Sequence, residues 1–274
     1  MKAIIISDIC PLYVGTSSQS ELADEPLHGM VVETVSGVSD GYQRVRTHYR
    51  YEGFAEPANL LFDESRVGYW ENAPKWTVWA LYLDVKAKPD VRAGNMANCP
   101  RGGLLERLDS DEILEDGYIE VGLPDGRRGF ARRAGVEPQI ASWSRSDETR
   151  LRAELVRTAK TYMGAQYRWG GKTPLGIDCS GLTSMTYLLH GIHIYRDADL
   201  RPGFDMKEIP FEQKQPGDLL FFKGHVVMYI GNDEYIHSTA YREAVGVVIN
   251  SFDPDSPLYR GGLMEKFLKA GSAF

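Results

Sequence analysis

The clearest pattern of apolar positions lies in the C-terminal half of the chain. Apolar residues recur every three or four positions from Leu151 to Met163, and Gly164 ends this run. A second helical run extends from Ser180 to His190 and is followed by Gly191. Four runs typical of strands come after Pro216: GDLLFF, HVVMYI, EYIHS and VGVVINSF. We therefore predict two helices followed by an antiparallel sheet, an α+β layout.

The N-terminal half carries a repeat of turn and strand signals. DGYQRV at 40–45 is followed by GFA at 53–55, and DGYIEV at 116–121 is followed by GFA at 129–131, 76 positions further on. In each copy an Asp-Gly turn pair precedes alternating residues, which is the pattern of a β-hairpin. Short strands at this spacing predict a small all-β barrel that is repeated once. The tryptophans and tyrosine between Glu56 and Trp79 indicate a connector that packs against other residues.

These patterns divide the chain into three expected domains. The first covers residues 1–76 and includes the aromatic connector, the second covers 77–140, and the third covers 141–274. The third domain holds both predicted helices and all four predicted C-terminal strands.

Composition narrows the class of protein. The 274 residues are 43% hydrophobic and 25% charged with a net charge of −7, which is ordinary for a globular protein with a sizeable core. We see no basic stripe of the kind that binds nucleic acid and no apolar run near the ~20 residues that span a bilayer. The acidic balance favours a small soluble substrate over a polyanionic wall polymer. The start, MKAIIISD, is too short for a secretory signal and is expected to form a first strand.

The three cysteines point to a reducing compartment. Cys10, Cys99 and Cys179 are odd in number and far apart, so they predict neither a disulfide framework nor paired metal-ligand knuckles. Cys179 stands out because polar neighbours place it at the start of the second predicted helix, in GIDCSGLTSMTY. A helix N-terminus is expected to lower the pKa of a thiol and to offer N–H groups to an oxyanion.

Three interpretations of Cys179 stay open at this point: a small core residue, a ligand of zinc with scattered histidines, or a nucleophile. A nucleophile needs a base, and His190 lies about three helical turns away from Cys179, too far to serve. His225 and His237 are better placed. If 231–233 form a three-residue hairpin loop, the two histidines share one face of the sheet, whereas a two-residue loop would separate them.

Several motifs together resemble the NlpC family of papain-like bacterial cell-wall cysteine peptidases. They are YRWGGKTPLGIDCSGLTSMTY, RDAD, GDLLFF, GHVVMYIG and EYIHST, which occur in order between Leu151 and Leu268. The DGY–GFA repeat is similar to the SH3-like domains that precede the catalytic domain in one subgroup, the γ-D-glutamyl-L-diamino acid endopeptidases (dipeptidyl-peptidase VI). The resemblance implies an α+β papain-like catalytic domain preceded by two small all-β SH3-like barrels.

The resemblance also implies roles for four residues. Cys179 would be the nucleophile, His225 the general base and then acid, and His237 the third member, which orients His225. Asp178, directly before the nucleophile, would bind the free α-amine of an N-terminal L-alanine in the substrate. From the residues alone, Asp178 could equally be a helix N-cap.

Other matches concern the substrate pocket. Tyr167 and Trp169 match the aromatic positions of the family's Y-x-W-G-G segment, and Ser180 matches the serine after the nucleophile, so all three are implied to line the pocket. Arg196 and Asp197 match an R-D-A segment, which we interpret as structural.

The first SH3-like domain departs from the family pattern. The family commonly has a glutamate after the glycine of one loop, where this chain has Gly29 and Met30. Glu33, Tyr51 and Tyr69 are therefore only candidates for contacts from that domain.

The implied reaction is hydrolysis of the γ-linked bond between D-glutamate and L-lysine or meso-diaminopimelate in a freed murein stem peptide. The resemblance implies no metal or organic cofactor, and we expect a cytoplasmic monomer that recycles wall peptides without contact with membrane or nucleic acid. Alternatives are an endopeptidase that cuts intact peptidoglycan outside the cell, a non-catalytic wall-fragment binding protein, and an enzyme that sends the acyl group to another acceptor.

Overall fold

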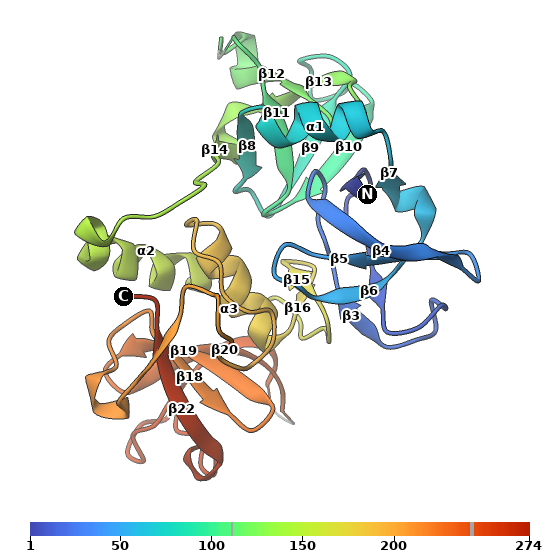
Figure 1. The fold of residues 1–274 in the computed structure, drawn as a ribbon. Coiled ribbons are helices and arrows are strands. Elements are labelled where there is room, and N and C mark those ends of the chain that lie inside the picture. Colours follow the sequence, from blue (N-terminus) through green and yellow to red (C-terminus); the bar gives the residue numbers. More distant parts are fainter. Residues whose placement is uncertain (111, 242–243) are drawn as a thin grey trace. The chain divides into compact units, whose positions relative to one another are not determined.

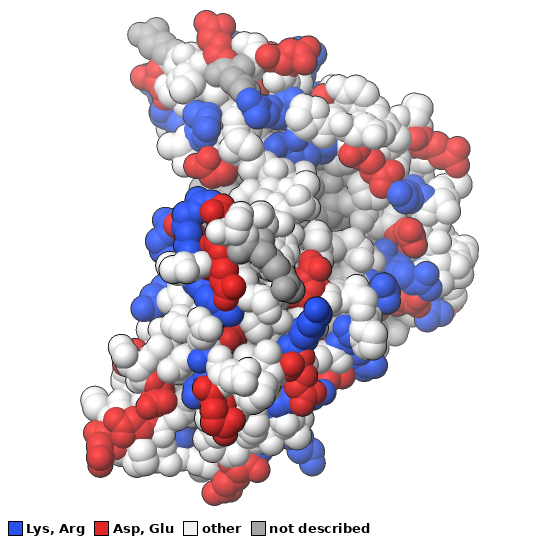
Figure 2. Space-filling model, turned by 60° about the vertical axis from the view of Figure 1, so that its left-hand side comes forward, with Lys and Arg blue, Asp and Glu red and all other residues white. Residues whose placement is uncertain are grey.

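The computed structural model describes residues 1–110, 112–241 and 244–274, which separate into two compact units (Figure 1). The first unit is Met1–Gln139 and the second is Ile140–Phe274. No helix among the described residues is long and apolar enough to cross a membrane. Acidic and basic side chains are interspersed over the face drawn in Figure 2.

Two antiparallel sheets form most of the first unit. The described strands of the first sheet follow the order β3-β2-β6-β5-β4-β1-β7. Their bounds are β1 Lys2–Ile5, β2 Leu12–Tyr13, β3 Leu22–Asp24, β4 Val31–Ser39, β5 Tyr42–Arg46, β6 Glu52–Ala55 and β7 Leu60–Leu61. The second sheet follows the order β10-β9-β13-β12-β11-β8-β14. Its bounds are β8 Lys75–Val78, β9 Tyr82–Lys86, β10 Asn95–Pro100, β11 Leu104–Arg107, β12 Tyr118–Gly122, β13 Arg128–Arg132 and β14 Val136–Pro138.

The repeat in the sequence corresponds to equivalent hairpins in the two sheets. Gln43 of β5 pairs with Ala55 of β6, and Ile119 of β12 pairs with Ala131 of β13, at the same offset in both. The Asp-Gly pairs that precede β5 and β12 all have positive φ angles, between 49° and 83°. Asp and Gly are among the residues that adopt this left-handed backbone most readily, and the expected turns and strands are confirmed.

The connector between the two sheets contains a helix that the sequence pattern did not predict. Helix α1, Glu64–Asn72, begins after Asp63, whose side chain accepts a hydrogen bond from the backbone N–H of Arg66. Trp70 is buried and donates from its indole N–H to the carbonyl of Gly29 over 2.7 Å. The connector therefore packs on the first sheet, as the density of aromatic residues indicated.

The second unit is an α+β structure. Helix α2 spans Glu148–Lys160 and helix α3 spans Cys179–Leu188, so both predicted helices are present, with ends shifted by one to three residues. The described strands of its main sheet are antiparallel in the order β17-β22-β18-β19-β20-β21. Their bounds are β17 Lys207–Ile209, β18 Leu219–Phe222, β19 His225–Gly231, β20 Glu234–Tyr241, β21 Ala244–Ser251 and β22 Phe267–Ser272. A small ribbon, β15 Lys172–Thr173 with β16 Gly176–Ile177, precedes α3.

Helix α3 is the element that positions Cys179. Every residue from Cys179 to Tyr187 is buried, and the helix packs against α2, β19 and β20 (Figure 1). A Cβ atom on Gly181 would fall well inside contact distance of the carbonyl oxygen of Gly171. Only a glycine at 181 therefore lets the first turn of α3 lie this close to the loop before β15.

We expect Gly181→Ala to destabilise the protein by about 1–3 kcal/mol, because the added methyl group collides with backbone that cannot move aside. Gly68→Ala is the matched control: it also lies within a helix, α1, but its Cβ would meet no atom within 4 Å. That control should be neutral or stabilising by roughly 0.5–1 kcal/mol. Urea unfolding of both variants and the wild type measures the difference, and equal stability of Gly181→Ala and the wild type would contradict the assignment.

Candidate active site

Cys179 is the first residue of α3 and is almost completely buried. It is 7% exposed, and Asp178 before it caps the helix by accepting from the backbone N–H of Gly181 over 2.6 Å. The backbone N–H groups of Val226 and Ser180 favour the thiolate form of Cys179 by hydrogen bonding. Because Val226 directly follows His225, this contact brings the thiol to the start of β19, where the predicted base begins the strand.

The two predicted histidines meet each other. His225 Nε2 and His237 Nδ1 are 2.7 Å apart, and His237 Nε2 is 3.0 Å from Oδ1 of Asn250 on β21. Asn250 is oriented in turn, because its Nδ2 donates to the carbonyl of Leu258 over 3.0 Å. The structure thus gathers His225 and His237 with Asn250, a residue that the sequence analysis missed.

This chain of hydrogen bonds decides where the protons lie. Asn250 presents Oδ1 as an acceptor, so Nε2 of His237 must carry a proton. The neutral ring then has an unprotonated Nδ1, which accepts from Nε2–H of His225. His225 is left with an unprotonated Nδ1, the lone pair that a general base requires.

His225 and His237 lie on the same face of the sheet because β19 contains a bulge. The turn between β19 and β20 has two residues, Asn232 and Asp233, with φ of 53° and 55°. Of the two loop lengths considered from the sequence, the two-residue loop is the one that forms, and by itself it would put the histidines on opposite faces. The register shifts between Tyr229 and Gly231, and the extra residue there, Ile230, restores the shared face.

Burial sets the charge state of the site. It raises the pKa of Cys179 to about 11, helped by the charge of Asp178 and opposed by the N–H groups of Val226 and Ser180 and by Arg196. The N–H groups at the start of α3 act in the expected direction, but burial outweighs them, so the pKa of the thiol is raised rather than lowered.

The pKa values of both histidines are lowered, whereas the pKa of the thiol is raised. Burial, followed by the neighbouring His237 and by Arg260, lowers the pKa of His225 to about 3. Burial also lowers the pKa of His237 to about 4, with Arg260 adding to the shift and the hydrogen bond to Asn250 opposing it. Between pH values of about 3 and about 11, Cys179 is therefore an uncharged thiol and His225 an uncharged imidazole in the resting enzyme.

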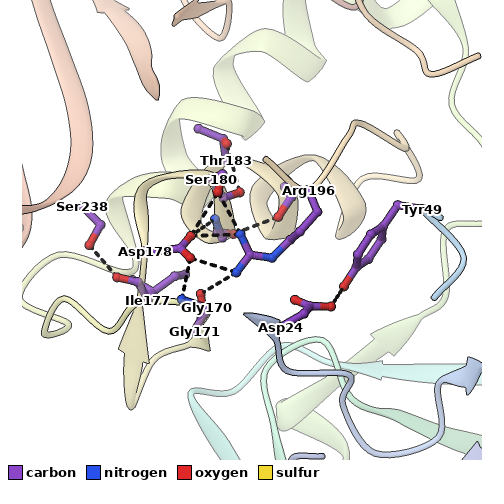
Figure 3. A network of polar contacts seen from close by, with 12 residues as sticks. Asp24, Tyr49, Gly170, Gly171, Ile177, Asp178, Ser180, Thr183, Arg196 and Ser238 are labelled. Carbon is purple, nitrogen blue, oxygen red and sulfur yellow. Dashed lines mark hydrogen bonds and ion pairs between the residues drawn. The ribbon is translucent and has the colours of Figure 1, made fainter. Parts of the chain in front are cut away.

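Asp178 belongs to a buried polar network that also contains Arg196 (Figure 3). The guanidinium of Arg196 is nearly inaccessible and pairs with both carboxylate oxygens of Asp178, each over 3.0 Å. Arg196 also donates to Ser180 Oγ over 2.8 Å and to the carbonyl of Gly171 over 3.3 Å. Asp178 further accepts from the backbone N–H of Gly170 over 2.8 Å, so the carboxylate is both a helix cap and half of an ion pair.

The predicted aromatic positions differ in their surroundings. Burial first, and then the charges of Cys179 and Asp178, raise the pKa of Tyr167, which therefore lies near both residues. Trp169 is 59% exposed, and a pocket-lining role for it stays a prediction. His190 binds Thr158 Oγ1 through Nε2 over 2.9 Å, consistent with its exclusion as the base.

The three residues that the sequence offered as candidate contacts from the first SH3-like domain lie in the first unit. Tyr69 is exposed on α1, and its hydroxyl donates to Glu106 within the first unit. Glu33 lies on β4, and Tyr51 precedes β6. Among the described residues, no three His, Cys, Asp or Glu side chains are grouped in a way that could hold a metal ion.

Comparison with known proteins places this arrangement in a family. The chain is 38% identical over 274 residues to a protein named Dipeptidyl-peptidase 6 from Lysinibacillus sphaericus, which covers the whole of both chains. The chain belongs to the NlpC/P60 family. The pattern that defines this family matches residues 164–257, which include Cys179, His225 and His237.

Other relatives agree on the family and the fold. A gamma-D-glutamyl-L-lysine dipeptidyl-peptidase of Bacillus cereus is 33% identical over 54% of this chain and 44% of its own length. The crystal structure of an NlpC/P60 family protein from Bacillus cereus superposes with a TM-score of 0.79 at 24% identity, over 98% of each chain, and shows the shared fold. The chain is accordingly a cysteine peptidase with the papain-like fold of NlpC/P60 proteins.

We expect Asn250→Leu to lower kcat by about 10- to 100-fold, because His237 loses the acceptor that holds its proton on Nε2. Asn250→Asp should recover part of the loss. Its carboxylate should also raise the pKa of His237 and move the acid limb of the kcat–pH profile to higher pH. Asn72→Leu, at an exposed position on α1, is the control. Equal kcat values and profiles for wild type and both Asn250 variants would contradict the positioning role.

The neutral resting pair predicts how Cys179 reacts with iodoacetamide. Because its pKa is about 11, the alkylation rate should rise about tenfold per pH unit between roughly pH 7 and pH 9 without levelling. Peptide mapping by mass spectrometry follows the rate at each cysteine. Cys10 and Cys99, both fully buried, should stay unlabelled and so report that the fold is intact. A plateau that starts near pH 6 would instead indicate a preformed thiolate–imidazolium pair.

Proposed function

We propose that this chain hydrolyses the γ-linked amide between D-glutamate and a diamino acid, meso-diaminopimelate or L-lysine, in a peptidoglycan stem peptide. The observation that carries the proposal is the similarity to Dipeptidyl-peptidase 6 of Lysinibacillus sphaericus, which extends through both units. The names of two Bacillus relatives, gamma-D-glutamyl-L-lysine dipeptidyl-peptidases, point to the same bond.

The geometry supports a thioester mechanism. As the sulfur of Cys179 attacks the γ-carbonyl carbon, its proton passes to Nδ1 of His225, and backbone N–H groups near Cys179 hold the oxyanion. Collapse of the tetrahedral intermediate breaks the C–N bond, and His225 gives the proton to the departing amine. Water then loses a proton to His225 and attacks the thioester, which releases the L-Ala-D-Glu dipeptide and restores the thiol.

A free N-terminal amine is the proposed recognition element. We assign it to Asp178, a 7%-exposed carboxylate next to the nucleophile, with Ser180 beside it and Tyr167 and Trp169 lining the pocket. The pairing with Arg196 offsets part of the charge of Asp178, so in this proposal the carboxylate acts mainly as a fixed acceptor for the ammonium.

The same proposal covers the remainder of the chain. We assign the two small antiparallel sheets of the first unit to two SH3-like barrels, on the basis of their repeated hairpin. The expected bounds were 1–76 and 77–140, and the boundary after residue 76 falls within β8, a strand of the second sheet. A free L-alanine amine exists only after the stem peptide has left the wall glycan. We therefore propose a monomeric enzyme that recycles freed wall peptides in the cytoplasm.

Purified protein incubated with L-Ala-γ-D-Glu-meso-diaminopimelate and with its N-acetylated form tests the proposal by mass spectrometry. We expect release of L-Ala-D-Glu from the free tripeptide alone, and a loss of at least about 10⁴-fold in Cys179→Ser and His225→Asn. His193→Asn, at an exposed histidine in the same unit, should retain activity.

Three other results would count against parts of the proposal. Equal cleavage of both peptides would refute amine recognition and favour action on intact peptidoglycan. Cleavage that persists in Cys179→Ser would refute the nucleophile. Cleavage of neither peptide would refute the proposed reaction and leave a wall-fragment binding protein.

A further inference from the structure

Arg260 brings a positive charge to the face of β20 that carries His237. Its Nη1 donates to Thr239 Oγ1 over 3.2 Å, and its guanidinium carbon lies 4.2 Å from the ring centroid of Tyr241. The ladder between β20 and β21 runs without a bulge from Glu234 to Tyr241. Side chains alternate along it, so residues 237, 239 and 241 share one face.

Among the described residues, no acidic side chain neutralises the charge of Arg260. Its described partners are a hydroxyl and an aromatic ring, and no carboxylate of the described residues lies within 4.0 Å of it. Arg196 and Arg152 of the same unit differ, because each is buried against a carboxylate, Asp178 and Asp218 respectively. Arg260 is half-buried, so water screens its charge only in part.

The charge of Arg260 also affects the pKa values of His225 and His237. Burial is the main reason for their low pKa values, and Arg260 lowers each of them further. Thr239, which Arg260 contacts, lies two residues from His237 on the same face of β20, so the guanidinium is on the side of the sheet where His225 exchanges protons with the reacting atoms. In the proposed reaction these atoms include the nitrogen of the leaving diamino acid.

The leaving residue has a carboxylate close to that nitrogen. Its α-carboxylate is attached to the same carbon as the departing amine, and it is free and charged when the peptide ends at the diamino acid. In a longer stem peptide this group is a neutral amide. A planar guanidinium discriminates well between the two, because it forms charge-assisted hydrogen bonds only with the carboxylate.

We propose that Arg260 binds the free α-carboxylate of the leaving diamino acid and so makes the enzyme selective for peptides that end at this residue. The assignment rests on the proposed γ-D-glutamyl hydrolysis and adds a recognition element at the opposite end of the substrate from the free amine. The side-chain carboxylate of meso-diaminopimelate has the same chemistry but lies at the far end of its aliphatic side chain. The structure favours the α-carboxylate because Thr239, the anchor of Arg260, is two residues from His237.

L-Ala-γ-D-Glu-L-Lys and its C-terminal carboxamide test the proposal, since lysine has no second carboxylate. We expect kcat/KM of the wild type to be about 10- to 100-fold higher for the acid, with most of the difference in KM. Arg260→Gln should bring the ratio of kcat/KM for the acid to that for the amide close to one. Arg260→Lys should keep part of the preference. Arg157→Gln, an exposed arginine on α2 paired with Glu154, is the matched control and should keep all of it.

The outcomes separate this inference from the proposed function. Equal cleavage of acid and amide by the wild type, or an unchanged preference in Arg260→Gln, overturns the role of Arg260 while the reaction stands. Cleavage of neither peptide overturns the proposed function itself. A meso-diaminopimelate tripeptide that is amidated only at the α-carboxylate distinguishes the two carboxylates of this residue. If it is cleaved as fast as the unmodified tripeptide, Arg260 does not bind the α-carboxylate.

Discussion

The hydrogen bond between His225 Nε2 and His237 Nδ1 is the interaction on which the site depends. It forms only if the two side chains leave the sheet on the same face, and a two-residue turn with one bulged residue, Ile230, meets this condition. It also needs a defined tautomer of His237, which Asn250 fixes by accepting a hydrogen bond from Nε2–H of that ring. The carbonyl of Leu258 fixes the amide of Asn250, so loop backbone outside the sheet determines which nitrogen of His225 is free.

Burial determines the charge states of the thiol and of the two imidazoles. Charged forms of the thiol and the imidazoles are disfavoured in the interior, so the resting groups are neutral, and charge separates only when the thiol attacks. The charged groups nearby are arranged differently. Asp178 and Arg196 neutralise each other and hold the first turn of α3. No carboxylate of the described residues pairs with Arg260, which contacts Thr239 on the face of β20 that carries His237. In the proposed function, these two arrangements correspond to the two ends of a short peptide, an ammonium and a carboxylate.

Much of the second unit could be predicted from the sequence because its signals are local. Apolar spacing and terminal glycines predicted both helices, and alternating runs predicted the strands from β18 to β21. Helix α1 was missed because, of its nine residues, only Val67 and Trp70 are buried, which leaves little periodicity to detect. Strands β17 and β22 were missed as well, since their burial follows from pairing with each other and with β18 rather than from an apolar run.

The site was predictable only in part for the same reason. Cys179, His225 and His237 stand in motifs, but the role of Asn250 depends on the packing of a third strand and on one loop carbonyl. An amide within the apolar run VGVVINSF was the available signal. The direction of the thiol pKa could not be predicted either, because the helix N-terminus is visible in sequence and the extent of burial is not.

Nitrogen-15 NMR of the histidine rings at neutral pH measures the proton positions of the site, since the shifts of Nδ1 and Nε2 report where each proton lies. The hydrogen-bonded chain from His225 to Asn250 predicts that His225 and His237 are both neutral and both protonated at Nε2. Asn substitution of each histidine in turn assigns the signals. A proton on Nδ1 of His237, or a doubly protonated His225 at that pH, would contradict this prediction.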